Sequence, residues 1–320
     1  MSAPPLRLRS ALTALALVCG LAVHGCNRQP APSSDGRVPA WLDVSPALGE
    51  PARDPADALA VLHAFGTGRL HVRGVSTTFG NAPLVRGFPA AQALLERLDS
   101  GRLRPWRGAS SAEEREAPTE ASELLTEALD EGPLTIVAAG PVTTIAAVLL
   151  RRPDLTARIE RLVMLGGQAG DGPVRPDPHV AADPGSVRVL LERDLAITLV
   201  PVAAEAGLRL DAADVNRLEA GDPLLRIVAA EARGWLAPRA TAGTPYLDAP
   251  ALLAIDVAAH PGEIRCEAAM AALSTEAGPA RLLVSGTPNA GGRRVTWCAA
   301  ADAGAHDRIV RDLLALRSTK

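Results

Sequence analysis

From residue 38 onward, short apolar runs alternate with longer segments that carry apolar residues at helical spacing. A short apolar run is typical of a strand buried on both faces, and the second pattern is typical of an amphipathic helix. The expected strands are 38–44, a run from Leu70 through Val75 into a Gly80-Asn81 loop, 134–139, 161–165 and 195–202. The expected helices are one that opens at Asp54, 89–99, 119–131, 143–151 and 183–192. This alternation predicts an α/β fold with an open, mostly parallel sheet and helices on both faces, a Rossmann-like core.

The C-terminal third is less regular. Residues 211–232 have a helical pattern, and 241–256 begin polar and become helical. Residues 281–285 and 293–298 predict a hairpin across the Gly-rich stretch between them, and 305–317 predict a closing helix. Residues 101–118 are polar and loop-like. With no repeat and no linker in this region, 38–320 is expected to be one domain.

The helix that opens at Asp54 has the chemistry of a helix start. Asp54 can cap, Pro55 suits the first helical position, and Asp57 stands where a capping-box acid would. Asp183-Pro184 repeats this arrangement before a later helix.

Polar and small residues gather where the predicted strands end. In parallel sheets, ligands bind beyond the carboxyl ends of the strands. The sequence therefore predicts the binding mouth at this edge, formed by Asp43 and Ser45, 77–81, 139–140 and 166–168.

The first residues have the pattern of a targeting signal. Arg7 and Arg9 precede an apolar run, 11–23, that is short for a membrane span. The run ends at His24-Gly25-Cys26, which resembles a bacterial lipoprotein signal with Cys26 as the lipidated residue. Residues 1–26 are therefore predicted to be a signal peptide and 27–37 a flexible tether, and the protein is predicted to be exported and anchored to a bacterial membrane, on its periplasmic or surface side. An ordinary secretory signal cut nearby is the alternative.

Composition excludes some classes of function. The net charge is −3, no Lys/Arg block interrupts the body, and aromatic residues make up 2% of the chain, so nothing indicates a nucleic-acid partner. Two cysteines, Cys266 and Cys298, lie in the body. They can form a disulfide in an oxidising compartment or remain buried thiols, and their spacing is not that of a metal site.

Several blocks in this order and spacing resemble the inosine–uridine-preferring nucleoside hydrolases. The blocks with the strongest similarity are Asp54–Ala60, Gly74–Leu84, Gly132–Ala146 and Arg161–Gly167, and weaker ones are Asp183-Pro184, Ile197–Val202 and Leu247–Ala249. The resemblance implies a nucleoside hydrolase-like fold that hydrolyses the N-glycosidic bond of ribonucleosides, and often a homo-oligomer. It also implies a calcium ion, held by Asp carboxylates and one backbone carbonyl, that orients the attacking water and the ribose hydroxyls.

The family's N-terminal signature is only partly matched. Asp43 matches the first Asp of that signature. Ser45 aligns with the second, which is the general base and a metal ligand in the family. The Asp-Asp pair aligns with Ala56-Asp57, so only the metal-binding Asp57 remains. Asp57 as a helix-capping acid is the alternative.

The downstream positions are matched unevenly. The carbonyl ligand would belong to Ala139, and Asp248 would be the distant metal ligand, but the His that precedes it in the family is Leu247 here. Asp177-Pro178-His179 aligns with the ribose-binding Glu-Phe-Asn. Asn81 is kept as a ribose contact, or is an ordinary turn residue.

These changes leave two hypotheses about function. The first is a nucleoside hydrolase with a degraded catalytic site and a weakened calcium site, because a Ser hydroxyl is a poor base near neutral pH. Asp54, Glu50 or Asp43 could then supply the missing carboxylate. The second is a non-catalytic protein that binds nucleosides or a ribose-like ligand, or has a structural role on the envelope.

Overall fold

The computed structural model describes residues 35–50, 53–98, 102–170, 177–202, 208–276, 278–287 and 292–319. Within these residues, ten strands form one sheet in the order β3-β2-β1-β4-β5-β7-β12-β10-β11-β6, and β8 and β9 form a separate ribbon. The strands of the large sheet are β1 (Val38–Val44), β2 (Leu70–Thr77), β3 (Pro105–Arg107), β4 (Leu134–Ala138), β5 (Ile159–Leu165), β6 (Gln168–Ala169), β7 (Ile197–Val200), β10 (Glu267–Ser274), β11 (Arg281–Ser285) and β12 (Arg293–Trp297). The ribbon pairs β8 (Arg209–Asp211) with β9 (Tyr246–Asp248).

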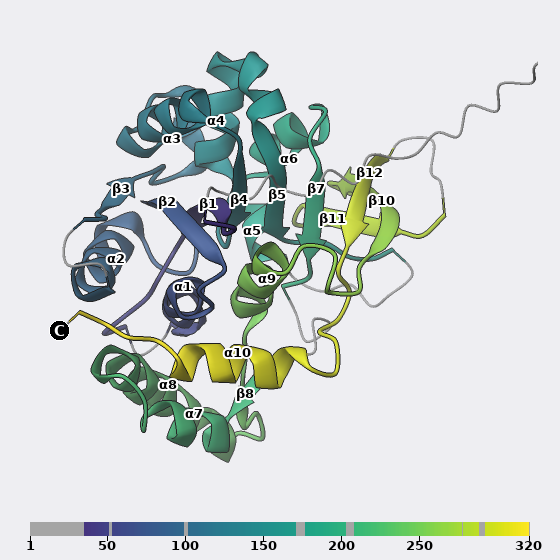
Figure 1. Cartoon of the computed structure of the whole chain (residues 1–320). Coiled ribbons are helices and arrows are strands. Elements are labelled where there is room, and N and C mark those ends of the chain that lie inside the picture. The colour runs from purple at the N-terminus through teal and green to yellow at the C-terminus, as the bar shows by residue number, and fades with distance from the viewer. Residues whose placement is uncertain are drawn as a thin grey trace, which may run out of the picture.

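Helices cover both faces of the sheet, as Figure 1 shows. The helices are α1 (Ala56–Gly66), α2 (Leu84–Leu98), α3 (Glu120–Glu131), α4 (Thr143–Arg151), α5 (Pro178–Ala182), α6 (Pro184–Leu191), α7 (Ala212–Leu218), α8 (Pro223–Thr241), α9 (Pro250–Ala259) and α10 (Ala305–Leu314), with 3₁₀ turns η1 (Ala112–Glu116) and η2 (Pro153–Arg158). α3, α4 and α6 lie on one face, and α1 and α9 lie on the other, where α7, α8 and α10 form a further layer. The predicted α/β class is confirmed.

The hydrophobic core consists of two clusters, one on each face of the sheet, and alternate side chains of β1 belong to different clusters. Leu42 and Val44 belong to the cluster under α1 and α9, whereas Trp41 belongs to the cluster under α3 and α4. Because successive side chains of a strand point to opposite faces, a strand covered on both sides must be apolar throughout. This explains why the central strands are readable as continuous apolar runs.

Several predicted boundaries were wrong. α2 begins at Leu84, not at Pro89, which lies inside the helix. A proline is unfavourable inside a helix, so Pro89 was predicted to begin the helix. Pro89 has no N–H to donate to the carbonyl of Val85, but Val85 is exposed. The loop predicted over 101–118 contains β3 and η1, and the helical pattern over 211–232 is two helices divided before Pro223.

The predicted hairpin was also wrong. β11 and β12 do not pair with each other, because β10 lies between them and pairs antiparallel with both. The sequence of β10 is rich in Ala, with Met and Leu, and these residues favour helices rather than strands. The sequence pattern therefore did not predict β10, and β11 and β12 were predicted to pair with each other.

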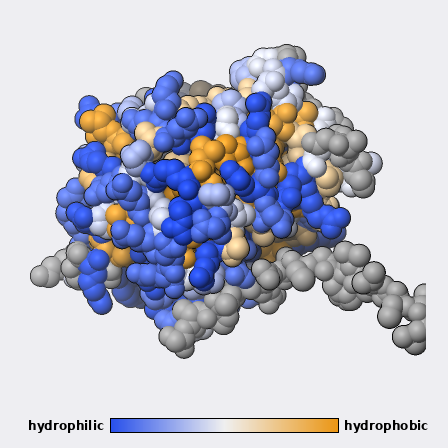
Figure 2. Space-filling model, turned by 90° about the horizontal axis from the view of Figure 1, so that it is seen from above, coloured by the Kyte–Doolittle hydropathy of each residue, from blue (hydrophilic) through white to orange (hydrophobic). Residues whose placement is uncertain are grey.

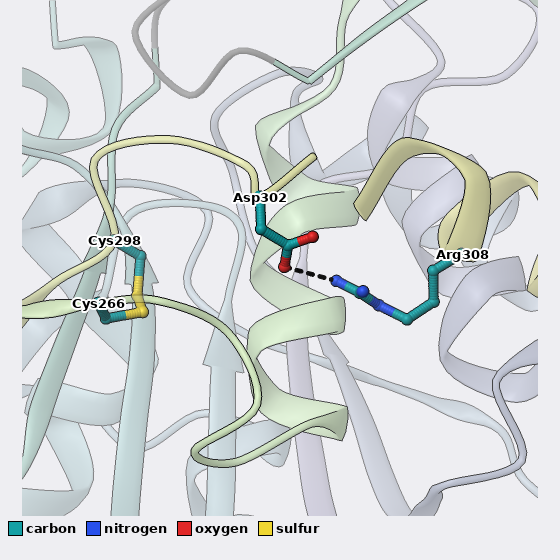
Figure 3. The surroundings of a disulfide bond; sticks show 4 residues. All are labelled: Cys266, Cys298, Asp302 and Arg308. Atoms are coloured by element: carbon teal, nitrogen blue, oxygen red, sulfur yellow. Dashed lines mark hydrogen bonds and ion pairs between the residues drawn. A yellow bond between two sulfur atoms is a disulfide. The ribbon is translucent and has the colours of Figure 1, made fainter. Parts of the chain in front are cut away.

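A disulfide joins Cys266 and Cys298 at the end of the β10·β12 ladder, beside the Glu267–Trp297 pair. Figure 3 shows it next to the segment that leads into α10, where Arg308 contacts Asp302. Of the two alternatives for these cysteines, the disulfide is the one observed.

The face of the molecule in Figure 2 is mostly hydrophilic. The face in Figure 2 carries hydrophobic side chains in small separate patches. Among the described residues, the exposed large hydrophobic side chains are Val85, Leu150 and Ile227, one on each of three helices. No helix in the described part of the chain is long and apolar enough to cross a membrane.

Candidate active site

The residues predicted to form the mouth lie at the carboxyl ends of β2, β1, β4 and β5, which are neighbours in the sheet. In the register of β1, Asp43 lies between Ser76 of β2 and Ala138 of β4. The chain leaves β1 through Ser45, whereas Asp57 follows on the first turn of α1. The parallel topology thus brings these polar groups to one edge of the sheet.

Asp43 is fully buried, and only one of its two carboxylate oxygens has a hydrogen-bond partner. Its Oδ1 accepts a 2.6 Å hydrogen bond from the Ser76 hydroxyl, which in turn accepts one from the indole N–H of Trp41 at 2.8 Å. Its Oδ2 is buried without a hydrogen-bond partner. Burial raises the pKa of Asp43 to about 7, against the opposing effect of the Ser76 hydrogen bond. Sequence reasoning missed Trp41 and Ser76, because nothing in a buried strand marks one polar side chain as the partner of another.

Ser45 is held by the loop that follows β2. Its hydroxyl donates to the carbonyl of Ala82 at 3.3 Å and accepts from the N–H of Ala82 at 3.2 Å, and the side chain has no solvent exposure. Glycines border it closely: a Cβ added at Gly80 would lie 3.6 Å from Ser45 Oγ, and one added at Gly140 would lie 3.7 Å from Ser45 Cβ. The hydroxyl at the position that the resemblance assigns to the general base is therefore occupied by backbone contacts.

The Asp57 carboxyl lies near the backbone N–H of Ser45, which acts on its pKa. Its Oδ2 is buried without a partner. Burial raises the pKa of Asp57 well above its ordinary value, the charge of Asp54 adds to this, and the Ser45 N–H opposes it. Asp57 therefore does not act as a capping-box acid: the residue at the N-cap is Pro55, which has no side-chain cap hydrogen bond.

Asp54 is a neighbour of two of the predicted metal ligands. Its Oδ1 accepts from the N–H of Ala56 at 3.1 Å, and its carbonyl accepts from the Asn81 side chain at 2.9 Å. Burial raises the pKa of Asp54; the N–H of Ala56 and the charge of Arg239 oppose this, and the charge of Asp248 adds to it. Of the other candidate replacement bases, Glu50 pairs with Arg86 at 3.3 Å.

Asp248 is placed differently from Asp57. It lies on β9 directly opposite Arg209 of β8, and Arg209 Nε donates to Asp248 Oδ1 at 3.1 Å. The guanidinium also lies over the ring of Tyr246, 4.1 Å from its centroid. Nothing in the sequence signalled Arg209, because it lies 39 positions from Asp248.

Two of the residues predicted to bind ribose belong to the start of α5: Asp177 is its N-cap residue and His179 lies in its first turn. Asp177 caps that helix by accepting from the N–H of Val180 at 3.2 Å, and it also accepts from the N–H of Gly167 at 2.9 Å. Burial raises the pKa of Asp177, and these two N–H groups oppose the rise. His179 has a buried Nδ1 without a partner, and burial lowers its pKa to about 4. Ribose binding by Asp177 and His179 stays a prediction.

The chain matches the family model described as inosine-uridine preferring nucleoside hydrolase over residues 51–281. The chain belongs to this family. A pyrimidine-specific ribonucleoside hydrolase, RihA of Salmonella paratyphi A, is 28% identical over an alignment that covers 56% of this chain and 67% of the relative. The nucleoside hydrolase family is generally calcium-dependent.

Solved nucleoside hydrolases share the fold. The plant nucleoside hydrolase PpNRh1 superposes with a TM-score of 0.74 at 17% identity, over 87% of this chain and 98% of that one. A purine-preferring ribonucleoside hydrolase from Gardnerella vaginalis gives a TM-score of 0.70 at 15% identity, over 87% and 98%. The predicted resemblance is confirmed. At these identities the structural likeness establishes the nucleoside hydrolase fold and not the site.

The residues present do not make a calcium site as they stand. Calcium takes six to eight oxygen ligands. Asp57 offers an unpaired oxygen, but Asp248 is engaged by Arg209. In the described part of the chain, no three His, Cys, Asp or Glu side chains are arranged to hold a metal ion. The donor set of Asp57, the Ala139 carbonyl and Asp248 therefore does not fit the ion.

Proposed function

We propose that this protein is a ribonucleoside hydrolase of degraded activity, which binds ribonucleosides at the edge formed by β1, β2 and β4 and hydrolyses their N-glycosidic bond slowly. One observation carries the proposal. The hydroxyl of Ser45, at the position assigned to the general base, is fully buried and bonded to both backbone groups of Ala82. A positioned general base contributes typically about 10²–10⁴-fold to a rate. The loss of that base therefore lowers the rate by a comparable factor.

Asp43 and Asp57 are poorly placed for proton transfer. Asp43 has a pKa near neutrality, as a general base should, but it is fully buried with one oxygen bonded to Ser76. Asp57 is also buried, and its raised pKa favours the protonated form, which accepts no proton. Neither Asp43 nor Asp57 therefore takes over the role of the general base that the family has at the position of Ser45.

The test is a hydrolysis assay with purine and pyrimidine ribonucleosides, in the presence of calcium and of a chelator. Free base should appear slowly, at least about 10²-fold more slowly than with a relative that has the base. Release as fast as that relative would contradict the degraded site.

Full burial of Ser45 also favours the second candidate, a non-catalytic nucleoside-binding or structural protein. Tight nucleoside binding without any base release would favour that candidate.

We also propose that the protein is exported and held at the bacterial membrane by a lipid on Cys26. Residues 1–34, which include Cys26, lie outside the described residues. The Cys266–Cys298 disulfide supports export, because disulfides form and persist in oxidising compartments. Homo-oligomerisation remains a prediction.

Replacement of Cys26 tests the anchor. The Cys26→Ser variant should move from the membrane fraction to the soluble fraction of the envelope, because the acylated residue is lost. Cys19→Ser, inside the apolar run, is the matched control and should leave partition unchanged. Membrane association that survives Cys26→Ser would contradict lipidation at this residue.

A further inference from the structure

The pairing of Asp248 bears on the metal requirement of the site. Sequence similarity assigns this carboxylate to calcium, but in the structure its Oδ1 accepts a 3.1 Å hydrogen bond from Arg209 Nε. Asp248 and Arg209 face each other across the β8·β9 ribbon, so the backbone register itself holds the two side chains together. The pair is therefore a consequence of the local fold and not of a chance side-chain approach.

Arg209 is also fixed on its other side. Its guanidinium lies 4.1 Å from the centroid of the Tyr246 ring, on the same ribbon. A guanidinium over an aromatic face is attracted by the ring, and its planar fork loses little freedom when it also binds a carboxylate. Two contacts thus hold the guanidinium beside Asp248. The side chains of Arg209 and Asp248 remain accessible, with 38% and 43% of their surface exposed.

We propose that Arg209 withholds Asp248 from divalent cations, so that the native protein does not bind calcium at the predicted site. The proposal rests on the proposed site and deepens it by assigning its metal dependence to one residue. A divalent ion bound by Asp248 would lie beside the guanidinium, and two cations at short range repel each other. The ion would also have to replace an existing charge-assisted hydrogen bond.

The remaining oxygens do not compensate for this loss. While Asp248 is paired, the predicted ligand set offers only the Asp57 carboxylate, with one unpaired oxygen, and the Ala139 carbonyl, and water would have to fill all the remaining positions of a calcium ion. When Arg209 is removed, Asp248 is free to join them. Removal of a positive charge is therefore expected to create a calcium response that the native protein lacks.

The experiment measures the thermal unfolding of the full chain in chelator and in about 10 mM calcium, a concentration that exceeds the Kd of weak extracellular sites. The native protein should unfold at the same midpoint in both. Arg209→Gln should gain a calcium-dependent rise of at least about 2 °C. Arg293→Gln, which breaks a comparable pair with exposed Asp194, is the matched control and should gain no response.

A double variant and a second single variant complete the test. Arg209→Gln/Asp248→Asn should lose the gained response, because the freed carboxylate is its source. Asp248→Asn alone should not alter the calcium response, and this variant is informative even if Arg209→Gln fails to fold. A native protein that calcium already stabilises, with loss of that effect in Asp248→Asn, would overturn the proposal, as would a folded Arg209→Gln that gains nothing.

These outcomes are separate from the proposed function. The readout is a shift in unfolding midpoint with calcium, whereas the function is read by the release of free base. A protein that hydrolyses nucleosides rapidly without calcium would contradict the degraded site and leave the role of Arg209 intact.

Discussion

Asp43→Asn should stabilise the protein at pH 8 by up to about 4 kcal/mol, because the variant removes a buried charge that the fold does not compensate. The pKa of Asp43 is about 7 in the folded state against 3.8 for the ordinary carboxyl. The folded state therefore binds the proton more tightly than the unfolded state. Stability that is fully present below pH 4 is lost as the pH rises through 7. Asparagine stays neutral at every pH and keeps an oxygen for the Ser76 hydroxyl.

Chemical unfolding between pH 4 and pH 8 measures this effect. The free energy of unfolding of the native protein should fall across that range relative to Asp43→Asn, and the two should approach each other at the acidic end. Asp194→Asn, which changes a fully exposed carboxylate, is the control and should follow the native curve. If Asp43→Asn follows the native curve or is less stable at pH 8, Asp43 is ionised and compensated in the fold.

Loss of the disulfide should destabilise the protein by about 3–4 kcal/mol. The bond joins residues 32 positions apart, and chain-entropy estimates for a loop of this length give that magnitude. The bond also fixes the start of the segment that leads to Asp302 and Arg308, and Arg308 in turn binds the buried Asp256 of α9. Its loss therefore loosens the attachment of α10 as well as the β10·β12 ladder.

The double variant Cys266→Ala/Cys298→Ala tests this. Its unfolding midpoint should be lower by roughly 5–7 °C, the shift expected for this free energy in a chain of this size. A reductant should lower the midpoint of the native protein by a similar amount and leave the double variant unchanged. Equal midpoints for the native protein and the double variant would show that the disulfide contributes nothing to stability.

The half of the fold that the sequence predicted is the half built from continuous apolar strands. β1, β4, β5 and β7 are covered on both faces, so nearly all of their residues are buried. β10 is instead Ala-rich with one half-exposed face, and propensity pointed away from a strand. It pairs with β11 across a short connection, but its pairing with β12 joins Glu267 to Trp297, and local patterns do not encode a contact over that separation.

The site was predictable only where it follows strand ends. Asp43, Ser45 and Asp57 gather at one edge because the parallel topology requires it. The contacts that decide their chemistry are tertiary: Ser45 binds Ala82, 37 residues away, and Arg209 reaches Asp248 across the ribbon. A resemblance predicts which carboxylates are replaced, but the hydrogen-bond partners of the remaining carboxylates are visible only in the folded chain.

The most direct test of the degraded site measures release of free base by the native protein and by Ser45→Asp in parallel. The variant breaks the two Ala82 hydrogen bonds and puts a second carboxylate beside Asp57, so its unfolding midpoint must first show that it is folded at the assay temperature. The account predicts slow release by the native protein and faster release, by about 10²-fold or more, in folded Ser45→Asp. Rapid release by the native protein, with no gain or a loss in folded Ser45→Asp, would contradict it.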